Sequence, residues 1–299
     1  MNNTPQQIIK EVEGLLSLPE AVISANQLLN SRSATARQVG EVISHDPALS
    51  AQLLKLVNSA FYGFSSPIDT ISRAVTVIGN RDLRSRILSA SVATVFDRIT
   101  PQLIDMDDFW HRSVYAGLVA KRLAENRVKG KRETLFITGL LHDIGKIVLF
   151  THLPERASEI LAQAADTGLP LHQIEQERLN FTTAELGAEL LESWNLGENL
   201  WLPIRYQRTP ERATGFETEA WMLYLAIALT DCVEPELKSA STMELTDLEV
   251  DPEALQSLGL SIDDLYGINQ EVNLECLDVL QIINPKAATS TADRSAISS

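Results

Sequence analysis

The segment from Leu135 to Phe150 is almost wholly apolar, yet it carries two adjacent ionisable residues, His142 and Asp143, at its middle. A segment of this composition belongs in a protein core. Burying an ionisable pair there costs several kcal/mol unless the pair is hydrogen-bonded, ion-paired or bound to a metal. The fold must therefore bring partners for His142 and Asp143 from elsewhere in the chain.

Composition restricts the environment and the partners. The 299 residues are 44% apolar and 22% charged, which is typical of a folded protein with a large core. A net charge of −15 disfavours nucleic acid as a partner, because phosphate binding needs a basic surface. Two widely separated cysteines, Cys232 and Cys276, and a polar N-terminus without a signal peptide indicate a cytoplasmic protein. The apolar run is too short and too polar at its middle to span a membrane.

Helical periodicity predicts an all-α protein, because no run of alternating strand-like residues is present. Helix start signals include Thr35, Asp46 followed by Pro47, and Thr182 or Thr183. The aromatic residues from Phe61 to Phe64 are expected to pack between two helices. The expected parts are an N-terminal helical subdomain (1–100), a second helical subdomain (101–240), a helical C-terminal extension (241–284) and a disordered tail (285–299).

Two residues could join His142 and Asp143 at a metal, namely His111 and Asp231, which are both flanked by core-type residues. Imidazole and carboxylate ligands together suit one Fe, Mn, Zn or Mg ion. The alternative, which we favour, is a structural pair held by hydrogen bonds and a nearby cation. Under that interpretation His111 is a buried histidine bonded to a core carboxylate.

The order His111, His142-Asp143, Asp231 resembles the metal-binding quartet of the HD phosphohydrolase superfamily. Lys146 stands at the lysine of the HDxGK signature of the HD-GYP phosphodiesterases, which hydrolyse cyclic di-GMP. The resemblance implies one metal that activates water against a phosphate ester. If the chain is an enzyme, the resemblance makes Asp143 and Lys146 its catalytic residues.

The N-terminal half contains the motifs Leu18-Pro19-Glu20, Ile43 to Leu49 (ISHDPAL), Leu56 to Gly63 (LVNSAFYG), Pro67-Ile68, Ile71 to Val75 (ISRAV) and Ile78-Gly79. On these motifs the chain resembles the HDOD domain, an HD-related output domain of bacterial signalling, and the similarity covers about Leu15 to Pro210. HDOD modules are regulatory and generally without demonstrated catalysis, and the resemblance implies an HD-like helical bundle.

The sequence departs from its HD relatives where they supply further histidines. Thr183 stands where a histidine is expected, and the segment from Gln207 to Pro210 (QRTP) replaces an HHxP motif. With five histidines in all, the chain lacks ligands for a second or third metal. Arg208 would instead place a cation near the vacant position and, with Lys146, could contact an anion. Glu175 is expected to be solvated or to cap a helix.

The favoured hypothesis is a non-catalytic HDOD signal-transduction module that acts by binding a signalling protein or a ligand, and that holds either no cofactor or one divalent metal. The first alternative is a mononuclear phosphohydrolase acting on a phosphate ester or nucleotide. The second is a cyclic-dinucleotide sensor without turnover. The sequence does not indicate an oligomeric state.

Overall fold

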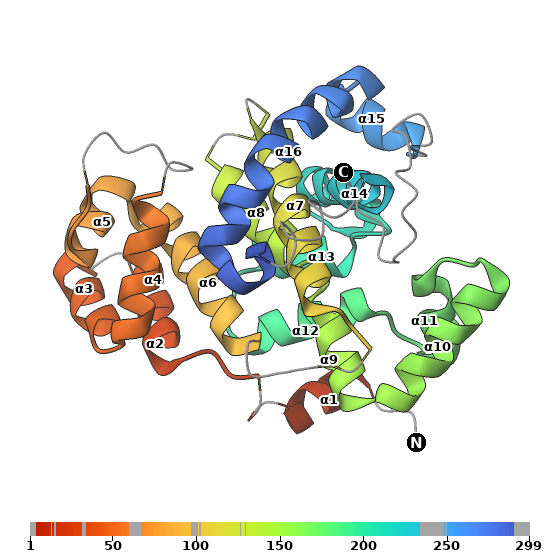
Figure 1. Cartoon of the computed structure of the whole chain (residues 1–299), viewed down its shortest axis with the longest axis horizontal. Helices are drawn as coiled ribbons and strands as arrows, with labels where there is room; N and C mark the ends of the chain where they lie inside the picture. Colours follow the sequence, from red (N-terminus) through yellow and green to blue (C-terminus); the bar gives the residue numbers. More distant parts are fainter. Residues whose placement is uncertain are drawn as a thin grey trace. The chain divides into compact units, whose positions relative to one another are not determined.

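The computed structural model describes residues 4–289 with gaps at 13, 15, 32–33, 60–66, 97–100, 102, 126, 129, 234–247 and 249. Within these residues every regular element is a helix, α1 to α16 and the 3-10 helix η2, and no strand is present (Figure 1). The predicted all-α class is confirmed. The aromatic residues from Phe61 to Phe64 and the end of the predicted tail, 290–299, lie outside the described residues.

The chain divides into two compact units. The larger unit contains residues 1–15 and 100–276, and the smaller contains residues 16–99 and 277–299. The short helix α1 (Pro5–Val12) packs on two helices of the larger unit, α9 and α12. The four-part division expected from the sequence stays a prediction.

The smaller unit is built from short helices whose starts follow the predicted caps. The Thr35 side chain accepts a hydrogen bond from the Gln38 N–H in a capping box, and Asp46 caps the next helix through the Leu49 N–H. Asn58 makes two hydrogen bonds of 2.7 Å with the backbone of Ile68, which ties the end of one helix to the next described segment. The helices are α2 (Glu20–Asn30), α3 (Ala36–Ser44), α4 (Pro47–Val57), α5 (Ile71–Ile78) and α6 (Asn80–Phe96).

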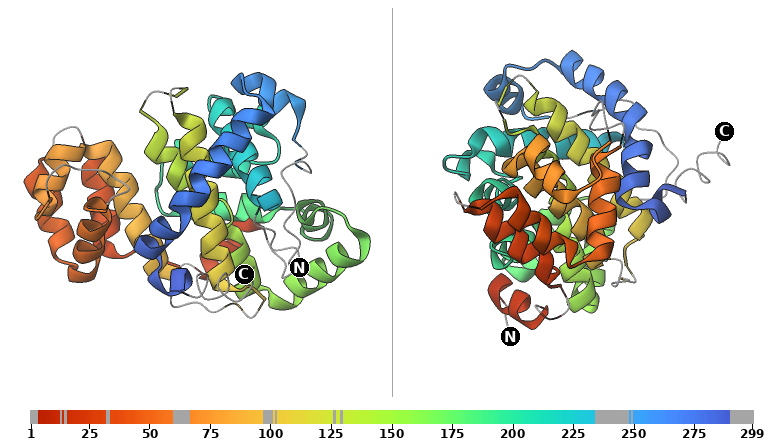
Figure 2. Two further views of the ribbon diagram at one scale, coloured as in Figure 1. Left: turned by 45° about the horizontal axis from the view of Figure 1, so that its top comes forward. Right: turned by 90° about the vertical axis from the view of Figure 1, so that its left-hand side faces the viewer.

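The larger unit is centred on two closely packed helices, α7 and α8. Close approach requires a glycine at Gly139, where a Cβ atom would lie 2.6 Å from the carbonyl oxygen of Ala116. Helices α10 and α11 run side by side and are drawn in green in Figure 2. The helices are α7 (Met106–Ala124), α8 (Arg132–Leu141), α9 (Ile144–His152), α10 (Pro154–Thr167), α11 (Leu171–Leu179), α12 (Thr183–Ser193), α13 (Glu198–Arg205), η2 (Pro210–Arg212), α14 (Glu217–Val233), α15 (Pro252–Leu258) and the first part of α16 (Ile262–Ile283).

His142 and Asp143 lie in a turn between two helices and not within one continuous helix. His142 follows the last residue of α8, and Asp143 precedes the first residue of α9 with φ −105° and ψ 9°. These angles fall in the bridge region, where the backbone leaves the helical path. The turn frees both side chains to face a neighbouring element. The stretch Arg132–His152 is apolar enough to cross a membrane by length and composition, but 83% of its apolar window is buried inside the protein, as is typical of a core helix.

Gly145 brings the start of α9 against the start of α12. A Cβ atom at this position would lie 1.9 Å from the carbonyl oxygen of Thr183 and 2.6 Å from the amide nitrogen of Gly187. Only glycine allows this approach. The glycine of the HDIGK motif thus places Thr183 beside the turn that carries His142 and Asp143.

Residues 285–289 are helical, although disorder is predicted from residue 285 onward. Ala287 and Ala288 are buried, and the Asn284 side chain accepts a hydrogen bond from the Ala287 N–H. Burial of the two alanines and the hydrogen bond from Ala287 to Asn284 order this segment, although its Ala-rich and Thr-rich composition predicts disorder.

Candidate functional site

A cavity of about 820 Å³ lies in the larger unit, between the start of α9 and the helices α11 to α14. Its wall carries more cationic side chains than carboxyl groups, in a chain whose net charge is −15. The cationic side chains are Arg112, Lys146, Arg205, Arg208 and Arg212, and the carboxyl groups are Asp143, Glu175, Glu185 and Asp231.

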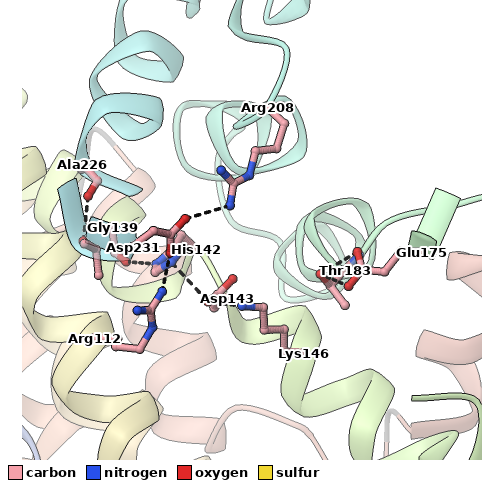
Figure 3. Close-up of polar contacts among 11 residues, drawn as sticks. Arg112, Gly139, His142, Asp143, Lys146, Glu175, Thr183, Arg208, Ala226 and Asp231 are labelled. Carbon is pink, nitrogen blue, oxygen red and sulfur yellow. Dashed lines mark hydrogen bonds and ion pairs between the residues drawn. The ribbon is translucent and has the colours of Figure 1, made fainter. Parts of the chain in front are cut away.

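Asp231, near the end of α14, lies between two guanidinium groups (Figure 3). Its Oδ1 atom is 2.5 Å from Nη2 of Arg112, and its Oδ2 atom is 3.3 Å from Nη2 of Arg208. The Arg112 side chain is 7% exposed, whereas that of Asp231 is 43% exposed. Burial raises the pKa of Asp231, but Arg112 and Arg208 outweigh it, so the pKa lies below its ordinary value. Asp231 is therefore held as a carboxylate by protein cations.

His142 and Asp143 are also held by the protein. The His142 ring is buried, and its Nδ1–H donates to the carbonyl oxygen of Gly139 at 2.7 Å. Its Nε2 atom faces Asp143 Oδ2 at 3.3 Å, and the Lys146 ammonium lies 2.8 Å from the same oxygen. Burial raises the pKa of Asp143, but His142 and Lys146 lower it further, to well below its ordinary value.

Glu175 is a buried acid at the cavity wall, 1% exposed, and it caps the start of α12. Its carboxylate accepts the Thr183 N–H at 2.9 Å and the Thr183 hydroxyl at 3.0 Å. Burial raises the pKa of Glu175, and the hydrogen bonds from Thr183 only partly offset this. Capping was one of the two predicted roles for Glu175. Solvation, the other, is wrong, because the Glu175 side chain is buried.

His111 is not in the cavity wall. Its Nε2 atom lies 3.7 Å from Cys276 Sγ on α16, while the next residue, Arg112, reaches Asp231. Consecutive residues on a helix point about 100° apart, so α7 can direct only one of the two toward Asp231. Asp143 and Asp231 thus line the cavity, His142 lies behind the wall against Asp143, and His111 lies elsewhere.

The arrangement does not fit a metal ion. In the part of the chain that the structure describes, no three His, Cys, Asp or Glu side chains are grouped as metal ligands. A divalent ion at Asp231 would have to displace the Arg112 guanidinium, and the displaced cation would stay buried without its counter-charge. A second ion-binding position, at Asp143, is taken by the Lys146 ammonium. Protein cations therefore stand where the HD quartet would require a metal.

Arg112 and Glu175 are among the residues of the site that were not assigned to it from the sequence, as are Arg205, Arg212 and Glu185. A signal for Arg112 exists in the sequence, since it is a second ionisable residue between Trp110 and Val114 in a core-facing helix. A signal for Glu175 is its spacing from Leu171, which places it on the apolar side of α11. The sequence alone does not select Arg112 over His111.

Among proteins of related sequence, an uncharacterized protein of Treponema pallidum is 27% identical over 202 residues. The match spans 67% of this chain and 38% of that protein, so the chain covers less than half of its relative's length.

Solved structures share the fold. A candidate phosphohydrolase from Shewanella amazonensis is 27% identical, with a TM-score of 0.71 and coverage of 94% of this chain and 97% of that one. An HDOD domain protein of unknown function from Geobacter sulfurreducens is 21% identical, with a TM-score of 0.68 and coverage of 94% and 97%. A candidate signal transduction protein from Marinobacter aquaeolei is 20% identical, with a TM-score of 0.67 and coverage of 93% and 61%.

The HDOD domain family model matches residues 15–210, which is about two thirds of the chain and contains the cavity's α9, α11, α12 and α13. The same range holds the ISHDPAL and LVNSAFYG motifs and the turn with His142 and Asp143. The chain belongs to the HDOD domain family.

Proposed function

We propose that this chain is a non-catalytic HDOD regulatory module of the bacterial cytoplasm, which acts by binding a signalling protein or a ligand. The observation that carries the proposal is the ion pair between Arg112 and Asp231, which puts a guanidinium where an HD phosphohydrolase would place a metal. Membranes and nucleic acids are not among the proposed partners, in keeping with the net charge of −15.

Electrostatics supports this proposal over hydrolysis. A hydrolytic HD site needs a metal to lower the pKa of a bound water and to polarise the phosphate ester. Here Asp231 and Asp143 already have cationic partners, and their lowered pKa values follow from those partners. Neither guanidinium nor ammonium groups generate hydroxide from water at neutral pH. The cluster therefore maintains a charged, ordered core without a catalytic water.

A mononuclear phosphohydrolase is the second candidate, because one feature of the turn favours it. The His142 Nδ1–H is fixed on the Gly139 carbonyl oxygen, as is common for a metal-ligating histidine, and its buried Nε2 atom faces Asp143. For hydrolysis, Arg112 would have to release Asp231 so that the carboxylate could join His142 and Asp143.

The test compares the wild-type chain with Arg112→Ala, which removes the closer of the two cationic partners of Asp231 and leaves Arg208. Protein purified without chelator is assayed for bound metal by mass spectrometry and for phosphate release from a panel of nucleotides and phosphomonoesters, with Mn, Fe, Mg or Zn added. We expect the wild-type chain to hold less than stoichiometric metal and to release no phosphate. Stoichiometric metal together with hydrolysis that Asp143→Ala abolishes would refute the proposal.

The regulatory role is tested by affinity capture from a bacterial lysate, with the tagged wild-type chain as bait. A matched bait carries Arg156→Gln, an exposed position whose ion pair with Glu159 is open to solvent. We expect both baits to retain the same signalling protein at similar yield. Recovery of no partner by either bait, together with phosphate release, would assign the chain to the second candidate.

A further inference from the structure

We propose that one wall of the cavity binds a phosphate monoester with hydroxyl groups near its phosphate, such as a sugar phosphate or a mononucleotide, without a metal ion. This wall, here called the arginine wall, consists of Tyr206, Gln207, Arg208 and Arg212. The inference rests on the proposed non-catalytic function and names the class of ligand for the same cavity.

Arg212 supplies a cation that the protein itself does not neutralise. Its guanidinium stacks over the Tyr206 ring at 5.3 Å from the centroid, and among the described residues no carboxylate lies within ion-pair distance of it. A guanidinium stacked on a ring is held in place while its N–H groups stay available, and its planar fork matches two phosphate oxygens. Arg212 is therefore prepared to bind an anion at the cavity mouth.

Arg208 can turn to the same anion at little cost. Its hydrogen bond to Asp231 is long, at 3.3 Å, and its side chain is 37% exposed. Asp231 keeps the shorter ion pair with Arg112 when Arg208 leaves, so no carboxylate is stranded. Two arginines four residues apart can then hold one phosphate group.

Gln207 adds a requirement for a hydrogen-bond donor on the ligand. The residue is 5% exposed and lines the cavity, and its Oε1 atom is buried without a hydrogen-bond partner in the described part of the structure. A buried acceptor without a donor destabilises the folded state. A ligand hydroxyl next to the phosphate would supply that donor, whereas the dianion of a simple monoester such as methyl phosphate has no O–H group to donate.

The volume of the cavity suits a small organic ligand. About 820 Å³ lies within the range of roughly 300–1,000 Å³ that is common for small-molecule sites. Across the cavity, His172 and Gln173 on α11 present further polar groups. The site therefore has room for a sugar ring beside the phosphate.

Calorimetry of the full chain in the presence of EDTA tests the proposal, with ribose 5-phosphate, methyl phosphate and ribose as probes. We expect binding of ribose 5-phosphate to the wild type and to the control Arg156→Gln, and at least tenfold weaker binding to Arg208→Gln and Arg212→Gln. Gln207→Leu should lower the preference for ribose 5-phosphate over methyl phosphate, because methyl phosphate has no hydroxyl group to donate to Gln207. Melting temperatures without ligand establish that each variant is folded.

Three results would overturn the inference: no binding of ribose 5-phosphate at millimolar concentration, equal binding to the wild type and both arginine variants, or binding only after Mn²⁺ is added. Phosphate release in the same samples is a separate readout. Release of phosphate with arginine-dependent binding would refute the non-catalytic function and leave the arginine wall in place. Absence of both binding and release would refute the arginine wall alone.

Discussion

Replacing Arg112 by methionine tests whether a protein cation, rather than a metal, holds the carboxylate of Asp231. Methionine keeps much of the side-chain volume and removes the charge. The pair is asymmetric, because the Arg112 side chain is 7% exposed and that of Asp231 is 43% exposed. Breaking a fully buried pair costs about 3–5 kcal/mol, and breaking an exposed one costs about 0–1 kcal/mol.

The loss of unfolding free energy expected for Arg112→Met lies between these two limits. Asp231 retains Arg208 at 3.3 Å and is open to the cavity, so part of its charge stays compensated. We therefore expect Arg112→Met to lower the unfolding free energy of the larger unit by about 2 kcal/mol. For a unit of this size, that loss corresponds to a fall in melting temperature of about 4–8 °C.

Urea unfolding followed by tryptophan fluorescence measures this loss in the larger unit. All four tryptophans of the chain, Trp110, Trp194, Trp201 and Trp221, lie in that unit, so the signal reports its unfolding alone. A double-mutant cycle with Asp231→Asn isolates the pair, and we expect a coupling free energy above about 1 kcal/mol. The exposed control Arg156→Met should change the unfolding free energy by less than about 0.5 kcal/mol. An Arg112→Met variant as stable as this control, or a coupling near zero, would contradict the reasoning.

Three further outcomes follow from the same site. Gly145→Ala should lower the unfolding free energy by at least about 2 kcal/mol in urea titrations, because the new Cβ would lie 1.9 Å from the Thr183 carbonyl oxygen. The lowered pKa of Asp143 stabilises the folded state at pH values above the pKa of an unfolded aspartate, about 3.9, and this stabilisation is lost as pH falls toward the pKa of the folded state. In Asp143→Asn the unfolding free energy, measured in urea at each pH, should therefore fall less steeply below pH 4 than in the wild type. The raised pKa of Glu175 has the opposite effect on stability. Its stabilising contribution is complete below the pKa of the unfolded state and is lost as pH rises through the pKa of the folded state. The stability of the wild type relative to Glu175→Gln should therefore grow as pH falls from 7 toward 4, as measured by chemical unfolding at each pH.

Local chemistry explains why the helices could be predicted from the sequence. Thr35, Asp46 and Thr182 each accept a backbone N–H in the first turn of a helix, as their positions before apolar periodic segments predict. Gly168 ends α10 in the left-handed conformation with φ +66°, ahead of Pro170, which also follows from residue type. These features depend on neighbours within a few residues, so one sequence is sufficient to find them.

The site depends on contacts between helices that are distant in the sequence, and the sequence alone does not predict which side chains meet there. His111 and Arg112 have the same apolar flanks, and only the packing of α7 against α8 and α14 determines which of them meets Asp231. The break between His142 and Asp143 is likewise invisible in the apolar periodicity, which continues on both sides of it. Asp143 and Asp231 could be selected as site residues from the sequence, but only the packing of the helices shows that their partners are cationic side chains.

Because protein cations neutralise Asp231, a ligand could change the cavity without disturbing the core. A metal would tie His142, Asp143 and Asp231 to one ion, and its loss would expose several buried charges at once. Here Asp231 has two cationic partners, and the more exposed one, Arg208, faces the cavity together with Arg212. An anion can therefore draw Arg208 away while Arg112 keeps the core neutralised, so binding at the cavity changes the arginine wall and leaves the fold intact. A regulatory module needs this separation, because its signal must be reversible under conditions in which the rest of the protein stays folded.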